Sequence, residues 1–136
     1  MLPTTLLITN KTNISYFSHF TGSNGVLLVH KDKGYLLTDA RYHIVAKKVL
    51  PPDYSIIDIT GGFDAAWSQL LKRLKPRVIG YEGNDISLAF FNKIKKKSSP
   101  IKLEDVECSI EEMRMAKTEE EVRSIKKAQS ITDSLF

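Results

Sequence analysis

Apolar residues in this chain fall into short runs that are separated by polar turns. The runs at residues 25–30 and 35–38 flank a polar connector that ends in Gly34, and this spacing predicts a β-hairpin. The same signals, with proline or glycine at the boundaries, predict three more strands at residues 54–59, 78–81 and 101–106.

Between the strands, apolar residues recur every three or four positions, which predicts helices with one buried face. Asp39 is placed to cap a helix over residues 40–50, which the following prolines end. Two further helices are predicted at residues 63–74 and 85–97. Strands that alternate with helices after a hairpin indicate a three-layer α/β/α fold around a mixed sheet of about five strands.

The end of the chain predicts one more helix. Thr118 and Glu121 have the spacing of a capping box, in which each side chain bonds the other residue's backbone N–H. The modest apolar face that follows includes Val122, Ile125 and Leu135, and no glycine, asparagine or proline ends it. We therefore expect a first domain over residues 1–117, with residues 118–136 as the linker and first helix of a truncated second domain.

Composition narrows the class of protein. With 42% hydrophobic and 26% charged residues, the chain can bury an ordinary globular core. No apolar run approaches the roughly 20 residues that a membrane-spanning helix needs, and the first residues do not resemble a secretion signal. Cys108 is the only cysteine, which excludes an internal disulfide and a cysteine-based metal site. These observations predict a cytoplasmic protein that does not enter membranes.

The net charge of +4 does not predict nucleic-acid binding. Lysines and arginines gather at the ends of the second and third predicted helices, where cations favour the helix dipole, and no aromatic residues are interleaved with them. Whether the second group is a solubilising face or a contact surface stays open; it consists of Lys93, Lys95, Lys96 and Lys97.

The residues alone point to no catalytic or metal-ligating group. His19, His30 and His43 stand in none of the spacings typical of metal ligands. Ser18 and Ser23 lack the strand–turn–helix context of a nucleophilic serine. The glycines of residues 21–25 lead into a strand, so they do not form a phosphate loop.

Two segments contain side chains that could bind a ligand and that a purely structural domain would not need. Residues 16–25 form an aromatic-rich segment expected to be a loop, in which Tyr16 or Phe20 offers a hydrophobic wall. Residues 37–42 join a strand to a helix, at the kind of strand end where α/β folds present ligands, and Arg41 offers a bidentate donor for a carboxylate. A purely structural explanation is open for both segments, with aromatic residues in the core, Asp39 as a helix cap and Arg41 paired locally.

Four segments in the same order resemble the N-terminal domain of the creatinase/prolidase family of pita-bread enzymes, in particular its Xaa-Pro dipeptidases and Xaa-Pro aminopeptidases. They are residues 16–25, 36–42, 79–82 and 114–122. The match departs at His19, where the family usually has glycine.

This resemblance implies a ribonuclease H-like N-terminal domain without catalytic groups of its own. Two divalent metal ions, manganese or cobalt, are expected in a separate catalytic domain that cleaves the bond before proline. The N-terminal domain is expected to support a homodimer and to wall the site for a proline-containing peptide. The residues expected nearest that substrate are Phe20, Ser23, Asn24, Arg41 and Tyr42.

Two other functions fit the same architecture. The parent protein could have lost its metals and act as a peptide-binding or chaperone-like module, or it could be a creatinase-type amidinohydrolase. The segments at residues 20–23 and 38–42 favour the peptidase branch of the family. Loss of the five metal ligands from the catalytic domain would identify the binding module.

Overall fold

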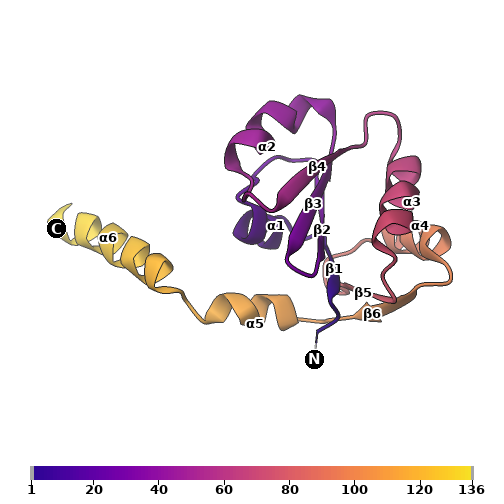
Figure 1. Ribbon diagram of the computed structural model, residues 1–136. Coiled ribbons are helices and arrows are strands. Elements are labelled where there is room, and N and C mark those ends of the chain that lie inside the picture. Colours follow the sequence, from indigo (N-terminus) through magenta and orange to yellow (C-terminus); the bar gives the residue numbers. More distant parts are fainter. Residues whose placement is uncertain (1, 136) are drawn as a thin grey trace.

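The computed structural model describes residues 2–135 and contains one six-stranded sheet, with strand order β4-β3-β2-β1-β5-β6 (Figure 1). Only β2 runs against the other five strands, which are mutually parallel. The carboxyl ends of those five strands therefore meet at one edge, called here the carboxyl edge. The strands are β1 (Thr5–Ile8), β2 (Val26–His30), β3 (Lys33–Thr38), β4 (Tyr54–Asp58), β5 (Val78–Tyr81) and β6 (Lys102–Asp105).

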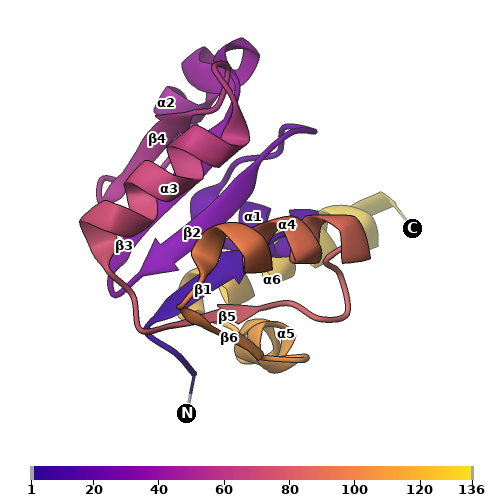
Figure 2. The same ribbon diagram turned by 90° about the vertical axis from the view of Figure 1, so that its right-hand side faces the viewer.

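Helices cover both faces of the sheet, which confirms the predicted α/β/α layers. On one face, α3 (Phe63–Leu74) and α4 (Leu88–Ser98) pack over a core centred on Trp67 (Figure 2). On the other face, α1 (Lys11–Ser18), α2 (His43–Val49) and α5 (Ser109–Met115) cover a second core that contains Phe20 and Leu36. The sheet therefore has a buried layer on each side, as its almost continuously apolar central strands require.

The predicted hairpin is confirmed, with a tighter turn than expected. Lys33 and Gly34 belong to β3, so only Lys31 and Asp32 connect it to β2. Lys31 takes a positive φ of 55°, the backbone conformation that two-residue hairpin turns demand.

The prediction for the first 25 residues was incomplete. The structure has a strand, β1, and a helix, α1, where none was predicted, and residues 16–18 belong to α1 rather than to a loop. Helix α1 begins with polar residues and its apolar pattern is weak, but Asn10 caps it by accepting from the Asn13 N–H at 3.1 Å. The sheet consequently has six strands instead of about five, with β1 in its interior.

His19 ends α1 with a left-handed backbone, at φ 61° and ψ 8°. Glycine is the usual residue in this conformation because it has no side chain to clash. A glycine, which the family resemblance predicts at this position, would suit this conformation, and here the histidine adopts it.

Two predicted helices begin differently in the structure, and one further helix was not predicted. Helix α4 starts at Leu88, after Ser87, whose hydroxyl accepts from the Phe90 N–H, so Asp85 is not its first residue. The helix predicted at residues 40–50 opens with a 3-10 turn, η1 (Ala40–Tyr42), before α2. Helix α5 was not predicted, because its seven residues carry too few apolar side chains to show a period.

A buried carboxylate joins several of these elements at the carboxyl edge. Glu82, which follows β5, is 1% exposed. Its Oε2 accepts from the backbone N–H groups of Thr9 at 2.7 Å and Asn10 at 2.8 Å, and its Oε1 accepts from Asn13 Nδ2 at 2.5 Å. Asn13 Oδ1 in turn accepts from Arg114 of α5 at 3.0 Å. The end of β1, the start of α1 and α5 are therefore held to β5 through one side chain.

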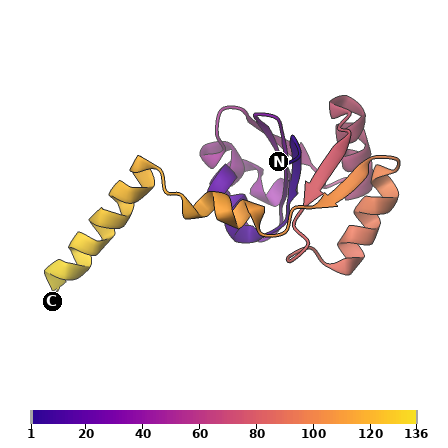
Figure 3. The same cartoon turned by 90° about the horizontal axis from the view of Figure 1, so that it is seen from below.

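The last helix, α6 (Glu119–Leu135), extends away from the sheet and its covering helices (Figures 1 and 3). The predicted capping box is confirmed, since the Thr118 N–H donates to Glu121 Oε2 at 2.7 Å and the Glu121 N–H donates to Thr118 Oγ1 at 3.2 Å. The apolar side chains of α6 are exposed to solvent, among them Ile125 at 53% and Leu135 at 76%.

Candidate functional site

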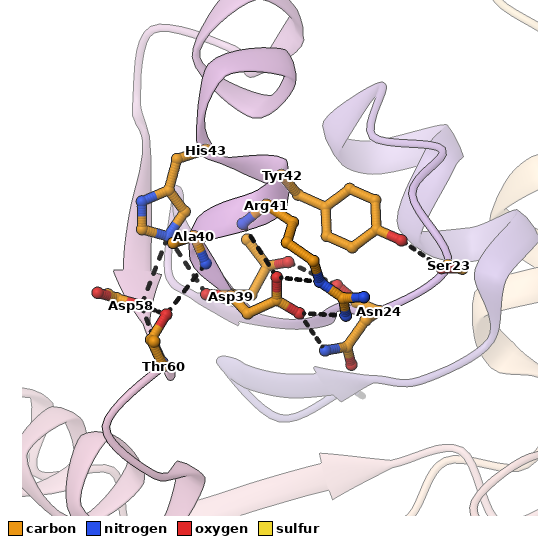
Figure 4. Close-up of polar contacts among 10 residues, drawn as sticks. Ser23, Asn24, Asp39, Ala40, Arg41, Tyr42, His43, Asp58 and Thr60 are labelled. Atoms are coloured by element: carbon orange, nitrogen blue, oxygen red, sulfur yellow. Dashed lines mark hydrogen bonds and ion pairs between the residues drawn. The ribbon is translucent and has the colours of Figure 1, made fainter.

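The two segments that the sequence analysis selected meet at the carboxyl edge (Figure 4). One is the loop between α1 and β2, which carries Ser23 and Asn24. The other is the turn from β3 into η1, which carries Asp39, Arg41 and Tyr42. Because β2 and β3 are antiparallel neighbours, the start of one lies beside the end of the other, and the two segments come into contact.

The centre of the site is the contact between Asp39 and Arg41. Asp39 Oδ1 accepts from Arg41 Nε and Asp39 Oδ2 accepts from an Arg41 terminal nitrogen, both at 2.9 Å. Oδ1 also accepts from the Arg41 backbone N–H at 3.0 Å, which caps the turn as predicted. These bonds, led by the Arg41 side chain, hold the pKa of Asp39 well below its usual range.

Asn24 fixes the other side of this carboxylate. Its Nδ2 donates to Asp39 Oδ2 at 2.6 Å, which also lowers the pKa of Asp39. The backbone carbonyl of Asn24 accepts from Thr38 Oγ1 at 2.5 Å. The side chain and the backbone carbonyl of Asn24 are therefore both hydrogen-bonded to residues at the end of β3, and the loop cannot leave the site without breaking these two bonds.

Tyr42 also holds the loop between α1 and β2 in place. Its hydroxyl is hydrogen-bonded to Ser23, and its ring packs edge-on against Phe20 with centroids 5.6 Å apart. The Arg41 guanidinium lies over the same ring, 5.5 Å from its centroid. Gly22 makes this packing feasible, because a Cβ at that position would lie 2.3 Å from the Phe20 ring and 2.8 Å from the Tyr42 ring.

Three polar residues that the sequence analysis did not select extend the site toward β4. The Ala40 N–H donates to Thr60 Oγ1 at 3.1 Å, and Thr60 is held by Asp58, which accepts from its backbone N–H at 2.9 Å. His43 Nε2 lies 3.6 Å from Asp58 Oδ1. The sequence does contain a signal for this contact. At the end of a predicted strand, Asp58 precedes Thr60 by two residues, the spacing of an Asx turn, in which an aspartate side chain accepts from the backbone N–H two residues further on.

The arrangement suits recognition of an acceptor group. The Arg41 side chain is 75% exposed although Asp39 holds one edge of its guanidinium. Its orientation is thus fixed. The exposed guanidinium lies over the ring of Tyr42, whose hydroxyl is hydrogen-bonded to Ser23. A carboxylate or a peptide carbonyl is the chemistry that such a group of donors binds.

The predicted site residues fall into two groups. Ser23, Asn24, Arg41 and Tyr42 lie together, and all but Tyr42 are exposed. Phe20 is 1% exposed and belongs to the core on the α2 face. It therefore affects the site only by packing against the ring of Tyr42. The contacts expected from a purely structural explanation of these segments are also present: Arg41 pairs with Asp39, and Asp39 caps the turn.

Within residues 2–135, no three His, Cys, Asp or Glu side chains are grouped so that they could hold a metal ion. The same part of the chain has no helix long and apolar enough to cross a membrane.

Fold and site together define a three-layer α/β domain with a donor-rich polar site at the carboxyl edge of its sheet. The sequence profile of the creatinase/prolidase N-terminal domain matches residues 4–116. The chain therefore belongs to this family, as the four sequence segments predicted.

Individual relatives agree with this assignment. The chain is 30% identical over 131 residues to the uncharacterized peptidase YqhT of Bacillus subtilis, a match that covers 96% of this chain and 37% of YqhT. Among solved structures, the X-Pro aminopeptidase of Thermotoga maritima is 29% identical with a TM-score of 0.84, over 97% of this chain and 39% of that one. The Xaa-Pro dipeptidase of Bacillus anthracis is 26% identical with a TM-score of 0.83, over 97% and 37%. This chain thus spans less than two fifths of the length of these relatives.

The close contact at Gly22 generates a prediction. Gly22→Ala should lower the free energy of unfolding by about 1–3 kcal/mol, because the added methyl group must displace the Phe20 and Tyr42 rings. Gly61→Ala is the matched control, since a Cβ there meets no atom within 4 Å. Chemical denaturation of both variants measures the difference, and equal stabilities would contradict the packing described for the loop.

The hydrogen bonds to Asp39 predict its behaviour in acid. Because its pKa is lowered in the folded state, the stabilisation from the Asp39–Arg41 pair is complete above pH 3.8, the ordinary value, and is lost only as the pH falls through the lower folded pKa. Titration of the Asp39 carboxyl carbon by NMR should give a midpoint below 3.8. A midpoint at or above that value would mean that the pair does not form in solution.

Proposed function

We propose that this chain is the non-catalytic N-terminal domain of a cytoplasmic, metal-dependent Xaa-Pro peptidase, and that it contributes substrate access and dimer contacts to the whole enzyme. The observation that carries the proposal is the family match over residues 4–116, together with the likeness to an X-Pro aminopeptidase and an Xaa-Pro dipeptidase. The reaction is hydrolysis of the peptide bond that precedes proline.

The carboxyl-edge site supports the substrate-access part of the proposal. A peptide presents a terminal carboxylate and backbone carbonyls. These groups can accept from the Arg41 guanidinium and from the one O–H that the Ser23–Tyr42 hydrogen bond leaves over. Asp39, itself held by Asn24, fixes the Arg41 guanidinium before a ligand arrives, so little side-chain freedom is lost on binding. The domain would thus orient a peptide without reacting with it.

The hydrolytic chemistry is assigned to the part of the relatives that this chain does not span. Two divalent metal ions, manganese or cobalt, would supply the attacking hydroxide and polarise the carbonyl there. The residues described in this chain offer no cluster that fits such ions.

An activity assay tests the proposal. The 136-residue chain should hydrolyse neither an Xaa-Pro dipeptide nor a longer Xaa-Pro peptide in the presence of manganese, whereas the protein that joins it to its catalytic domain should hydrolyse one of them. Hydrolysis by the chain alone would contradict the absence of catalytic groups. An inactive joined protein would favour the peptide-binding alternative.

The same assay separates substrate access from folding. Arg41→Gln in the joined protein should raise KM several-fold, because it removes an exposed donor. The metal content should be unchanged, and the melting temperature should fall only by the small amount that the lost Asp39–Arg41 contact contributes. Lys72→Gln, an exposed change on α3 far from the carboxyl-edge site, is the control and should leave KM unchanged. If the two variants behave alike, Arg41 does not contact the substrate.

A further inference from the structure

The edge of the sheet opposite the carboxyl edge carries a pocket that is lined by positive charges. Three segments meet there: the turn between β2 and β3, the connection from α3 to β5, and the residues that lead into β1 (Figure 2). They form a pocket of about 360 Å³, called here the amino-edge pocket. Its polar lining consists of Thr4, His30, Lys31, Lys75 and Arg77, and the other described residues that line it are apolar. The lining therefore contains cations and no carboxylate.

The strand order brings these cations together. Lys31 directly follows β2, Arg77 directly precedes β5, and β1 lies between those two strands. The Lys31 N–H donates to the Thr4 carbonyl at 2.7 Å, which fixes the hairpin turn beside the start of β1. Because neighbouring strands lie about 4.8 Å apart, the backbones of Lys31 and Arg77 are separated by about 10 Å. Two side chains of this length can reach one group that lies between them.

The protein does not neutralise the charges of the amino-edge pocket. The side chains of Lys31, Lys75 and Arg77 are exposed, and none of them forms an ion pair within residues 2–135. Lys75 follows the last residue of α3, where the negative end of the helix dipole favours a cation. That end is equivalent to about half an elementary charge, whereas three cations line the pocket. The remaining positive potential attracts an anion that carries more than one charge.

Both lysines of the pocket occupy backbone positions that favour glycine. Lys31 has a φ of 55°, and Lys75 has a φ of 49° with a ψ of 52°, so both are left-handed. Glycine or asparagine is the usual residue at such a hairpin turn or helix end, because longer side chains crowd the backbone there. The local backbone thus does not explain a lysine at either position, whereas an anion shared between the two turns explains both.

His30 adds an oriented ring to the same pocket. Its Nδ1 lies 2.7 Å from the hydroxyl of Thr5, a residue that is fully buried, so the position of the ring is fixed. With Nδ1 accepting from that hydroxyl, the neutral ring carries its proton on Nε2, which can donate to a ligand. Burial and, after it, the charge of Lys31 lower the pKa of His30. The Lys31 ammonium therefore acts on this ring, and an anion beside it would act in the opposite direction.

We propose that the amino-edge pocket binds a phosphate group, carried by inorganic phosphate or by a phosphate monoester. The Arg77 guanidinium can bond two phosphate oxygens, while Lys31 and Lys75 supply point charges. A carboxylate has one charge and two oxygens, so it would leave part of this set unused. A nucleic acid suits the pocket less well, because none of the described lining residues is an aromatic residue on which a base could stack. No residue of the carboxyl-edge site takes part, so this proposal does not depend on the peptidase function.

NMR titration of the chain with sodium phosphate, at constant ionic strength and near neutral pH, tests this site. The ring signals of His30 and the amide signals of Lys31 and Arg77 should shift and saturate, with a dissociation constant of about 0.1–10 mM. Arg77→Gln should raise that constant by about tenfold or more, because it removes the bidentate donor. Phenyl phosphate distinguishes the two sources: tighter binding than inorganic phosphate identifies a monoester as the ligand, and weaker binding identifies free phosphate.

Two further variants separate binding from folding and from net charge. Lys75→Gly should weaken phosphate binding several-fold and leave the melting temperature unchanged or higher, because glycine suits the left-handed backbone. Lys48→Gln removes one charge from exposed α2, on the other face of the sheet, and should leave the dissociation constant unchanged. Shifts that grow linearly without saturation overturn the proposal. So does a Lys48→Gln variant that weakens binding as much as Arg77→Gln, or a single-stranded oligonucleotide that shifts these signals when phosphate does not.

Discussion

The carboxylate of Glu82 is the interaction on which the carboxyl edge depends. A buried charge is tolerated only when hydrogen bonds replace its water, and Glu82 receives them from Thr9, Asn10 and Asn13. These donors set where β1 ends and where α1 begins. The end of α1 in turn fixes where the loop to β2 begins, and this loop brings Asn24 to Asp39. The geometry of the candidate site thus rests on a residue that contacts none of the site's side chains.

The site itself is a small set of mutually fixed donors on a rigid sheet. Asp39 orients Arg41, Asn24 orients Asp39, and Thr38 holds Asn24. Such a chain of contacts leaves the outer guanidinium edge free and costs little entropy when an acceptor binds. Pre-organised donors of this kind suit the binding of an acceptor group, which is the property that the proposed function requires of the site.

The sequence predicted the elements with strong periods and missed those without them. Helix α3, with Trp67, Leu70 and Leu71 on one face, and the hairpin of β2 and β3 were found because burial imposes a clear pattern. Helix α1 was missed because its apolar pattern is weak. Besides the local Asn10 cap, it is held by the bond from Asn13 to Glu82, which lies 69 positions away in the sequence. Arg41 was selected from its place at a strand end and Asn24 from the family resemblance of its segment, whereas the burial of Phe20 depends on packing that no local pattern reveals.

Amide hydrogen exchange at Thr9 and Asn10 tests the central position of Glu82 most directly. Both residues lie beyond the last residue of β1, so no strand ladder protects their N–H groups, and Glu82 is their acceptor. Their exchange should be as slow as that of Leu7 within the strand, and Glu82→Ala should speed it far more at these two amides than in α3. Exchange at the rate of an exposed loop in the wild-type chain would contradict the proposed dependence of the carboxyl edge on this carboxylate.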